Sequence, residues 1–334
     1  MSQSDETPIV KRSGPSVANI AAVVFILVGT AAVLLHRPIA NFIDRTMGTK
    51  LMGESKDLPQ KQAKKQTPSN DVNEIFRRAN DLQRRGNHRA AIEEYSDVIR
   101  LDPKFANAYT NRGLSYHRIG ERDRAFEDYS TAIKLDPNGK PSSIPYLNRS
   151  IIWRERGNLD RAFDDIENSL RLDPKLSLAH NAKGNIFRDR GDYDRAIGSY
   201  SEAIALNSSS AIAYTNRGIA YASKNEHRRA LDDFSAAIRI EPRNIGALVG
   251  RGTAYENLGE LDNGLTDFNE ALRHDRGNAN AYLGRGRVYL ARRDFIAAYS
   301  DFSDAARLNA RSAAAREGRG LANEGLGRRE EAIR

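Results

Sequence analysis

The sequence predicts an all-α solenoid of stacked helical hairpins, because a unit of 34 residues recurs from about Asp71 to Arg334. Pro103 and Pro137 lie 34 residues apart, each at the end of an LDP triplet, and Pro174 follows 37 residues later. A second register holds small residues, namely Gly113, Ser150, Gly184, Gly218, Gly252, Gly286 and Gly320. A third register holds Ala91, Ala125, Ala162, Ala196, Ala230, Gly264, Ala298 and Ala332. Three registers with one period predict a stack of identical supersecondary units.

Each unit is predicted to be a helix, a tight turn and a second helix, as residues 106–139 illustrate. Apolar or small side chains recur at helical spacing in the first half, at Tyr109, Gly113, Tyr116 and Ile119. Gly120 ends this helix, because glycine enters the left-handed conformation at little cost. The second half repeats the pattern at Ala125, Phe126, Tyr129, Ala132 and Ile133. Pro137 ends the second helix, since proline lacks an amide hydrogen and disfavours a helical residue before it.

Two rows of large side chains accompany the small residues along the chain. The first row is Tyr116, Trp153, Phe187, Tyr221, Tyr255 and Tyr289. The second row is Tyr95, Tyr129, Ile166, Tyr200, Phe234, Phe268 and Phe302. Such a ladder could be a platform for a ligand. Because large groups at helical spacing face small ones, we expect both rows to be core packing instead.

The unit resembles the tetratricopeptide repeat, in which a small residue, an aromatic, an alanine, a second aromatic and a proline fall at fixed offsets. The segments AYTNRGLSY…RAFEDYSTAIKLDP and AYTNRGIAY…RALDDFSAAIRIEP match that pattern at nearly every position. The resemblance covers about four-fifths of the chain, residues 71–334. It implies a right-handed superhelical solenoid of about seven full units and a partial eighth. The resemblance also implies a concave groove, lined mainly by the first helix of each unit.

The chain departs from this pattern in four places. Ser150 replaces glycine and Ile166 replaces the second aromatic in the third unit, while Gly264 replaces alanine in the sixth. Three extra residues in NGKPSSIP, between the second and third units, are expected to tilt one unit against the next. In the eighth unit Arg316 and Asn323 occupy the aromatic sites. A polar-faced last helix is typical of an end cap, and a truncated chain is the alternative.

The front of the chain is predicted to anchor the solenoid in a membrane. Residues 1–16 form a short polar tail, and residues 17–35 contain no charged side chain. Nineteen helical residues span about 28 Å, close to the hydrocarbon thickness of a bilayer. Residues 17–36 are therefore predicted to be a transmembrane helix that serves as a signal anchor. A cleaved signal peptide is the alternative, although RPIAN is a poor cleavage site.

Residues 37–70 are predicted to be a basic flexible linker, because they are polar and lack periodicity. Lys61, Lys64 and Lys65 could contact anionic lipid headgroups, or the segment could be merely a soluble tether. Positive charges on the two sides of the apolar segment nearly balance, so they hardly determine orientation. A short tail kept inside is the simpler insertion. We therefore expect a single-pass membrane protein with its solenoid on the exported side.

Composition excludes several classes of function. The 334 residues contain no cysteine, which rules out disulfides, thiolate catalysis and cysteine-ligated zinc. The net charge of +8 divides evenly, with nine Lys/Arg and five Asp/Glu in residues 1–70 against 43 and 39 in residues 71–334. The solenoid is thus nearly neutral for its length, and no face obviously concentrates positive charge. We do not expect nucleic-acid binding.

We expect neither catalysis nor a metal or cofactor. The six histidines are scattered without metal-binding spacing: His36, His88, His117, His180, His227 and His274. The GRG and NRG triplets recur because they are repeat positions inside helices, and they form no phosphate loop. Acidic pairs on the second helices, Asp164–Asp165 and Asp232–Asp233, are expected to be exposed rather than acid–base dyads. The repeats leave no segment for a catalytic domain.

The resemblance identifies candidate groove residues on four first helices. In the second unit these are Asn107, Thr110, Asn111, Leu114 and His117. In the third they are Leu147, Asn148, Ile151 and Arg154. In the fourth and fifth they are Asn181, Asn185, Arg188, Thr215, Asn216 and Ile219. Such a groove is expected to hold a protein or peptide partner rather than a small-molecule substrate.

Two details refine this expectation. Some members of the family hold a C-terminal carboxylate with two asparagines and several basic groups. Asn80 and Asn111 match the asparagines, but Phe76 and Ile144 stand where lysines are required, so we predict no carboxylate clamp. Asn111, Asn148 and Asn216 could instead bond the backbone of an extended peptide. Equally, these asparagines could simply be tolerated on a wet helix face.

The sequence therefore favours a membrane-tethered scaffold or adaptor that binds a protein or peptide in its groove and has no catalysis of its own. The alternative is a structural subunit of a membrane or cell-envelope assembly. Such a subunit would bind through the outer surface or the C-terminal end of the solenoid. An enzyme with its own activity is the least favoured reading.

Overall fold

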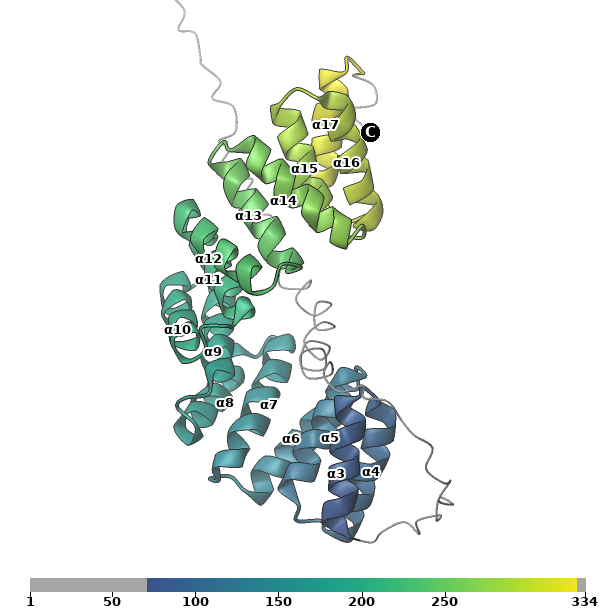
Figure 1. Ribbon diagram of the computed structural model, residues 1–334, viewed down its shortest axis with the longest axis vertical. Coiled ribbons are helices and arrows are strands. Elements are labelled where there is room, and N and C mark those ends of the chain that lie inside the picture. The colour runs from purple at the N-terminus through teal and green to yellow at the C-terminus, as the bar shows by residue number, and fades with distance from the viewer. Residues whose placement is uncertain (1–70, 329–334) are drawn as a thin grey trace, which may run out of the picture. The chain divides into compact units, whose positions relative to one another are not determined.

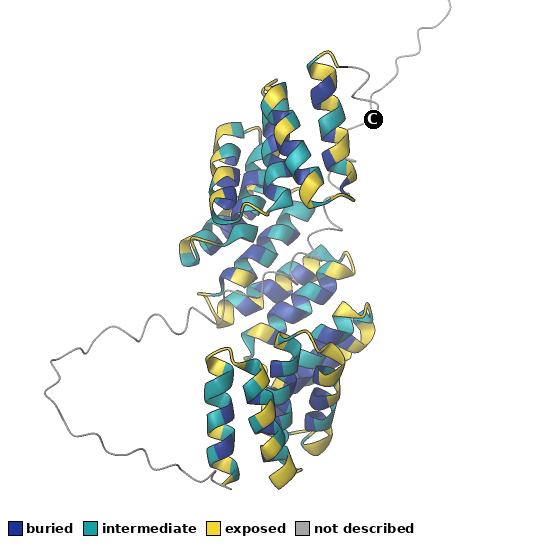
Figure 2. Ribbon diagram, turned by 90° about the vertical axis from the view of Figure 1, so that its right-hand side faces the viewer, coloured by how far each residue is buried: buried dark blue, intermediate teal, exposed yellow. Residues whose placement is uncertain are grey.

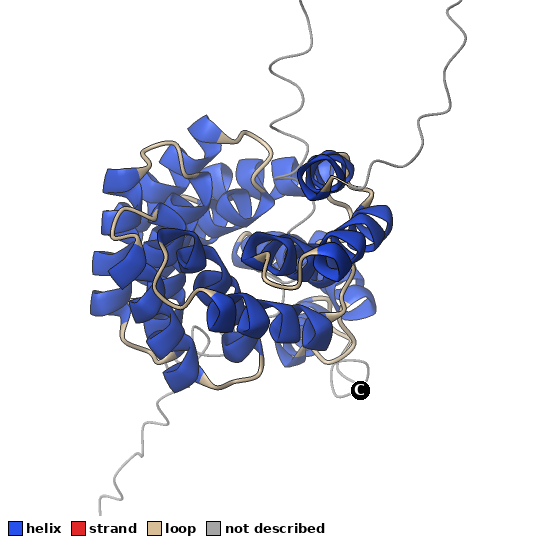
Figure 3. Cartoon of the chain, turned by 90° about the horizontal axis from the view of Figure 1, so that it is seen from below, coloured by secondary structure: helices blue, strands red, loops and turns tan. Residues whose placement is uncertain are grey.

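The computed structural model describes residues 71–328, and within them every regular element is helical (Figure 3). This part of the chain forms seven helical hairpins followed by one last helix. The first helices are α3 (Val72–Arg84), α5 (Ala106–Arg118), α7 (Ser143–Glu155), α9 (Ser177–Asp189), α11 (Ala211–Ser223), α13 (Ile245–Asn257), α15 (Ala279–Ala291) and α17 (Ala313–Gly325). The second helices are α4 (His88–Leu101), α6 (Arg122–Leu135), α8 (Leu159–Leu172), α10 (Tyr193–Leu206), α12 (His227–Ile240), α14 (Leu261–His274) and α16 (Phe295–Leu308).

The hairpins stack in chain order, each second helix packing against its own first helix and against the first helix of the next hairpin (Figure 1). The predicted solenoid of helical pairs is confirmed, while its right-handed sense stays a prediction. The predicted tail, transmembrane helix and linker, residues 1–70, lie outside the described residues. Among the described helices, none is long and apolar enough to cross a bilayer.

The turn inside each hairpin needs a residue in the left-handed conformation. Gly120 has φ of +87°, as its place at the end of the first helix predicts. Glycine occupies this place in most of the hairpins, but Asn225 and Arg293 adopt φ of 59° and 63° at the same place in the fifth and seventh. Asparagine tolerates this conformation better than most residues, whereas arginine pays a steric cost for it. The turn is therefore set by the packing of the two helices and not by glycine alone.

The second predicted row of large side chains is the core of the stack. Its seven members, from Tyr95 to Phe302, are at most 1% exposed, so the prediction of core packing is confirmed there. The first row is less deeply placed, since Tyr116, Tyr221 and Tyr289 are only half-buried. Buried positions lie where neighbouring helices face one another (Figure 2). Burial of this kind, repeated in every hairpin, supplies most of the stability of such a stack.

Glycines let the last three rings of the second row, Phe234, Phe268 and Phe302, fit between two first helices. A Cβ atom added to Gly252 would lie 2.9 Å from Phe268, and one added to Gly284 of the next hairpin would lie 2.3 Å from the same ring. Gly218 and Gly250 enclose Phe234 in the same way. Each of these three rings therefore joins its own hairpin to the next, which explains the small residues that recur there.

A buried arginine–aspartate pair recurs in five of the described hairpins. In each, the guanidinium donates two hydrogen bonds to an aspartate sixteen residues later, on the second helix of the same hairpin. The pairs are Arg112–Asp128, Arg149–Asp165, Arg217–Asp233, Arg251–Asp267 and Arg285–Asp301. Each arginine also donates to a serine or asparagine on the preceding second helix, as Arg217 does to Ser201 at 2.9 Å.

The expectation that the acidic pairs are exposed was wrong for one member of each. Asp165 and Asp233 are 4% exposed, because they face the arginine of their own first helix. Burial raises the pKa of both carboxyls, an effect that the arginine opposes. Asp164 and Asp232, one residue earlier, are on the solvent side as expected. A step of one residue turns a side chain by about 100° around a helix, so neighbouring acids meet different surroundings.

Three further features complete the stack. The extra residues of NGKPSSIP form a short 3₁₀ helix, η1 (Lys140–Ser142), directly before α7. The tilt expected from them stays a prediction. In the fourth hairpin Lys183 pairs with Glu167 of the preceding hairpin at 2.7 Å, and Ser199 stands where five other hairpins have the paired aspartate. On α17, Arg316 is exposed, as a polar end predicts, whereas Asn323 is only 2% exposed.

Candidate interaction face

One face of the solenoid is built only from first helices. Successive first helices contact one another along the described part, as α5 does α3 and α7, whereas no two second helices approach as closely. The second, sixth and ninth residues of each first helix point the same way, flanked by the fifth and twelfth. We call the surface made by these five places the inner face. It contains every residue that the sequence predicts to line a groove.

The structure places the predicted groove residues at three depths. Leu147, Thr110, Asn181 and Thr215 are buried, with at most 8% of their surface exposed. Both threonine hydroxyls donate to carbonyls one turn earlier in their own helices. These four residues therefore support the inner face more than they offer it to a partner. Asn107 is exposed. The half-buried residues are Asn111, Leu114, His117, Asn148, Ile151, Arg154, Asn185, Arg188, Asn216 and Ile219.

Hydrogen bonds between neighbouring hairpins hold two of the three predicted asparagines in place. The Asn111 side-chain nitrogen donates to Asn80 Oδ1 at 2.9 Å, and Asn216 donates to Asn181 Oδ1 at 3.0 Å. Each amide retains a second N–H. Asn148 makes no side-chain hydrogen bond with any described residue. Of the three predicted asparagines, Asn111 and Asn216 are thus oriented, while Asn148 remains free.

Two core tyrosines donate hydrogen bonds to asparagines of the inner face. The Tyr95 hydroxyl donates to Asn80 Oδ1 at 2.7 Å, and the Tyr200 hydroxyl donates to Asn185 Oδ1 at 2.8 Å. Burial raises the pKa of Tyr200 to about 12, so its hydroxyl remains a donor at neutral pH. This hydrogen bond from the core therefore holds the Asn185 side chain in one orientation.

Charged side chains gather at the C-terminal ends of α5, α7 and α9. Asp189 lies 2.6 Å from Arg154 Nε and 3.3 Å from Arg188 Nη2. Glu155 lies 2.8 Å from Arg122 Nε and 3.8 Å from His117 Nε2. The contact with His117 and the hydrogen bond from Arg122 lower the pKa of Glu155, against the desolvation that opposes them.

The inner face changes character toward the C-terminus. Arg287 donates to both carboxylate oxygens of Glu256 in the preceding hairpin, at 2.6 and 2.7 Å. Gly246 and Gly250 occupy the second and sixth places of α13. This part of the face therefore has small residues toward the start of α13 and an ion pair toward its end. The three predicted asparagines, Asn111, Asn148 and Asn216, lie earlier, on α5, α7 and α11.

Three exposed aliphatic side chains were missed by the sequence analysis. Ile144, Leu178 and Ile212 are 36%, 57% and 36% exposed, and each is the second residue of its first helix. They belong to consecutive hairpins. Their common place in the repeat was the available signal. Ile144 was considered only as a residue that stands where a carboxylate clamp requires lysine.

Three tetratricopeptide-repeat family models match segments of the chain. They match residues 79–120 and 184–225, residues 106–138 and 211–244, and residues 249–302. Together these segments span just over half of the chain. The chain belongs to the tetratricopeptide repeat family. No curated protein matches it.

Solved structures show the same tetratricopeptide repeat fold. A tetratricopeptide repeat protein from Parabacteroides merdae is 21% identical, with a TM-score of 0.57 over 76% of this chain and 99% of that one. A chain of the APC/C heterotetramer Cut9–Hcn1 is 18% identical, with a TM-score of 0.63 over 76% and 46%. The pilF protein of Pseudomonas aeruginosa is 17% identical, with a TM-score of 0.56 over 64% and 95%.

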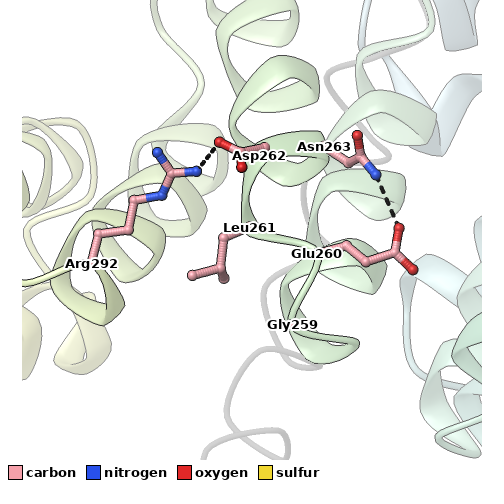
Figure 4. Close-up of a pocket in the computed structure, with 6 residues that line it drawn as sticks. All are labelled: Gly259, Glu260, Leu261, Asp262, Asn263 and Arg292. Atoms are coloured by element: carbon pink, nitrogen blue, oxygen red, sulfur yellow. Dashed lines mark hydrogen bonds and ion pairs between the residues drawn. The ribbon is translucent and has the colours of Figure 1, made fainter.

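A hollow on the surface of the tetratricopeptide repeats holds polar groups that bind one another. It has a volume of about 520 Å³ and lies at the turn between α13 and α14, beside Arg292 of the next repeat (Figure 4). Its polar groups pair with each other, since Arg292 binds Asp262 and Asn263 donates to Glu260. In residues 71–328 no group of three potential metal ligands comes together. The inner face is the better candidate for function.

Proposed function

We propose that this chain is a membrane-tethered scaffold that holds a protein or peptide against its inner face without catalysis of its own. Tetratricopeptide repeats generally bind proteins or peptides. The observation that carries the proposal is the composition of the inner face on α7, α9 and α11. Solvent-facing aliphatic side chains lie there beside a free amide, Asn148, and an oriented one, Asn216. Exposed apolar groups beside polar groups fixed in orientation are typical of recognition surfaces.

A photo-crosslinking residue placed at Asn148 in the full-length protein tests this proposal in cells. The matched control carries the same residue at Thr266, on the exposed side of α14. We expect a protein crosslinked at the first position and absent at the second. Calorimetry with that purified partner should then show weaker binding by Asn111→Ala/Asn148→Ala/Asn216→Ala, with an unchanged circular dichroism spectrum. Crosslinks confined to the outer position would contradict binding at the inner face.

The membrane tether rests on the uncharged segment of residues 17–36. Deleting these residues should move the protein from the membrane fraction to the soluble fraction of lysed cells. With the full-length protein, protease added to intact cells should digest the solenoid if it is exported. If the solenoid is not exported, digestion should require opened cells. A full-length protein that carbonate extracts from membranes would contradict the tether.

A second candidate function is a structural role in a larger assembly, through the C-terminal end of the solenoid. The observation that favours it is Ile296 on α16, whose exposure of 74% is unusual for an isoleucine. Light scattering of the full-length protein and Ile296→Asp discriminates the two. A structural subunit should lose its assembly on this change, whereas a scaffold that works through its inner face should keep its partner.

A further inference from the structure

Most exposed large aliphatic side chains of the described part fall into two groups. One group ends the second helices and recurs along the stack: Leu101, Leu135, Leu206 and Leu308. The other group is confined to three consecutive first helices: Ile144, Leu178 and Ile212. We call this second group the apolar row. A side chain that repeats throughout the stack reflects the architecture, whereas a row limited to α7, α9 and α11 has no such explanation.

The apolar row is bounded on both sides. Asn107 holds the corresponding place on α5 and Gly246 holds it on α13. The row also continues across the inner face, because Ile151 and Ile219 at the ninth places of α7 and α11 are half-buried and aliphatic. The exposed apolar row spans three hairpins, while Leu114 continues the half-buried aliphatic places onto α5. A partner therefore needs about three apolar side chains to cover the exposed row.

The opposite ends of α7 and α9 carry excess positive charge. Arg154 and Arg188 stand ten residues beyond Ile144 and Leu178, or about 15 Å along a helix. Both arginines share one carboxylate, Asp189. Glu155, the other carboxylate nearby, is already bound by Arg122. Charge complementarity therefore favours a partner with carboxylates on this side.

The spacing of the hairpins favours an extended partner. Neighbouring first helices in contact are about 8–10 Å apart. A polyproline II segment turns once every three residues and rises about 9.3 Å in doing so. Every third side chain then meets a successive hairpin. Such a segment has no internal hydrogen bonds, so its backbone needs partners, and the amides of Asn148 and Asn216 can supply them. A bound α-helix would satisfy its own backbone and would leave these amides unused.

We infer that the inner face of α7, α9 and α11 binds an extended peptide segment with an apolar side chain at every third residue and carboxylates beside them. The apolar side chains lie on the apolar row, and the carboxylates face Arg154 and Arg188. The inference rests on the proposed function, since it specifies the partner of the same face. A free phosphate or a lipid headgroup has no apolar side chains in register, so it does not fit the apolar row.

Selection from a random dodecapeptide display library tests the inference with the full-length protein in detergent micelles. We expect the enriched peptides to share aliphatic residues at a period of three and an excess of Asp and Glu. A synthetic peptide of that consensus should bind at least tenfold more weakly to Leu178→Asp. Leu206→Asp is the matched control, because it makes the same change at an exposed leucine outside the inner face, at the end of α10, and it should bind like the parent protein.

Each other result has one meaning. Enriched peptides with helical periodicity, or peptides bound equally by Leu178→Asp, overturn the extended apolar register and leave the proposed function intact. No enriched peptide, together with a protein crosslinked at Asn148, points to a folded partner and also overturns the inference. No enriched peptide and no crosslink at Asn148 overturn the proposed function itself. Circular dichroism of Leu178→Asp establishes that lost binding does not arise from unfolding.

Discussion

Replacing Asp233 with alanine removes one half of a buried ion pair. Arg217 Nε and Nη2 each donate to one carboxylate oxygen of Asp233, both at 2.8 Å, and Nη1 donates to Ser201 at 2.9 Å. The arginine thereby ties α11 to α12 and to α10 of the preceding repeat. Asp233 is 4% exposed, so water does not compete for its oxygens in the folded chain.

The expected cost of Asp233→Ala is about 3 kcal/mol. Removing one partner of a buried ion pair costs about 3–5 kcal/mol, because the remaining charge stays desolvated and unpaired. Arginine cannot escape this penalty by losing its proton. The Arg217 side chain is 20% exposed, so water reaches part of it, and this sets the expectation at the lower end. Asp97→Ala is the matched control, because its pair with Arg100 is exposed and is worth at most about 1 kcal/mol.

Hydrogen exchange measured by mass spectrometry is the appropriate assay, since a repeat stack unfolds locally and its parts interact mainly with their neighbours. A loss of about 3 kcal/mol lowers amide protection by about a hundredfold. We expect this loss in α11 and α12, a smaller one in α10, and none in α15 and α16. Replacing both partners, as in Arg217→Met/Asp233→Leu, should restore most of the protection. A loss no larger than that of Asp97→Ala, or one spread evenly over the stack, would refute the reasoning.

Two further changes test packing and titration. Gly284→Ala should destabilise the solenoid by about 1–3 kcal/mol, because its Cβ would lie 2.3 Å from Phe268. Gly198→Ala, on an open helix surface with nothing within 4 Å, should instead stabilise it by up to about 1 kcal/mol. Thermal melting of the two variants checks both signs, and equal shifts would contradict the packing argument. Burial lowers the pKa of His227, so the folded chain favours the neutral imidazole. The unfolded chain takes up a proton more readily as the pH falls below about 6.5. The stability that is present at pH 7.5 is therefore lost at lower pH. His227→Leu should therefore flatten the decline in melting temperature between pH 7.5 and pH 5, and an unchanged slope would show that this histidine does not contribute.

The local rules of the sequence determined the fold of residues 71–328. Apolar spacing of three to four residues and turn glycines such as Gly120 act within one hairpin. The period of 34 residues then repeated the result along the chain. Helical spacing and turn chemistry are short-range, so a single sequence carries them.

The tertiary structure alone decided which chemically similar residues face solvent. Asp164 and Asp165 are neighbours in sequence, yet only Asp165 is buried against an arginine. The sequence alone does not show that the amides of Asn111 and Asn216 donate hydrogen bonds to asparagines of the preceding repeat. The exposure of Leu178 likewise depends on how closely the adjacent first helices approach. Contacts between repeats join residues about 30 positions apart, and their geometry follows from the packing of whole helices rather than from any local pattern.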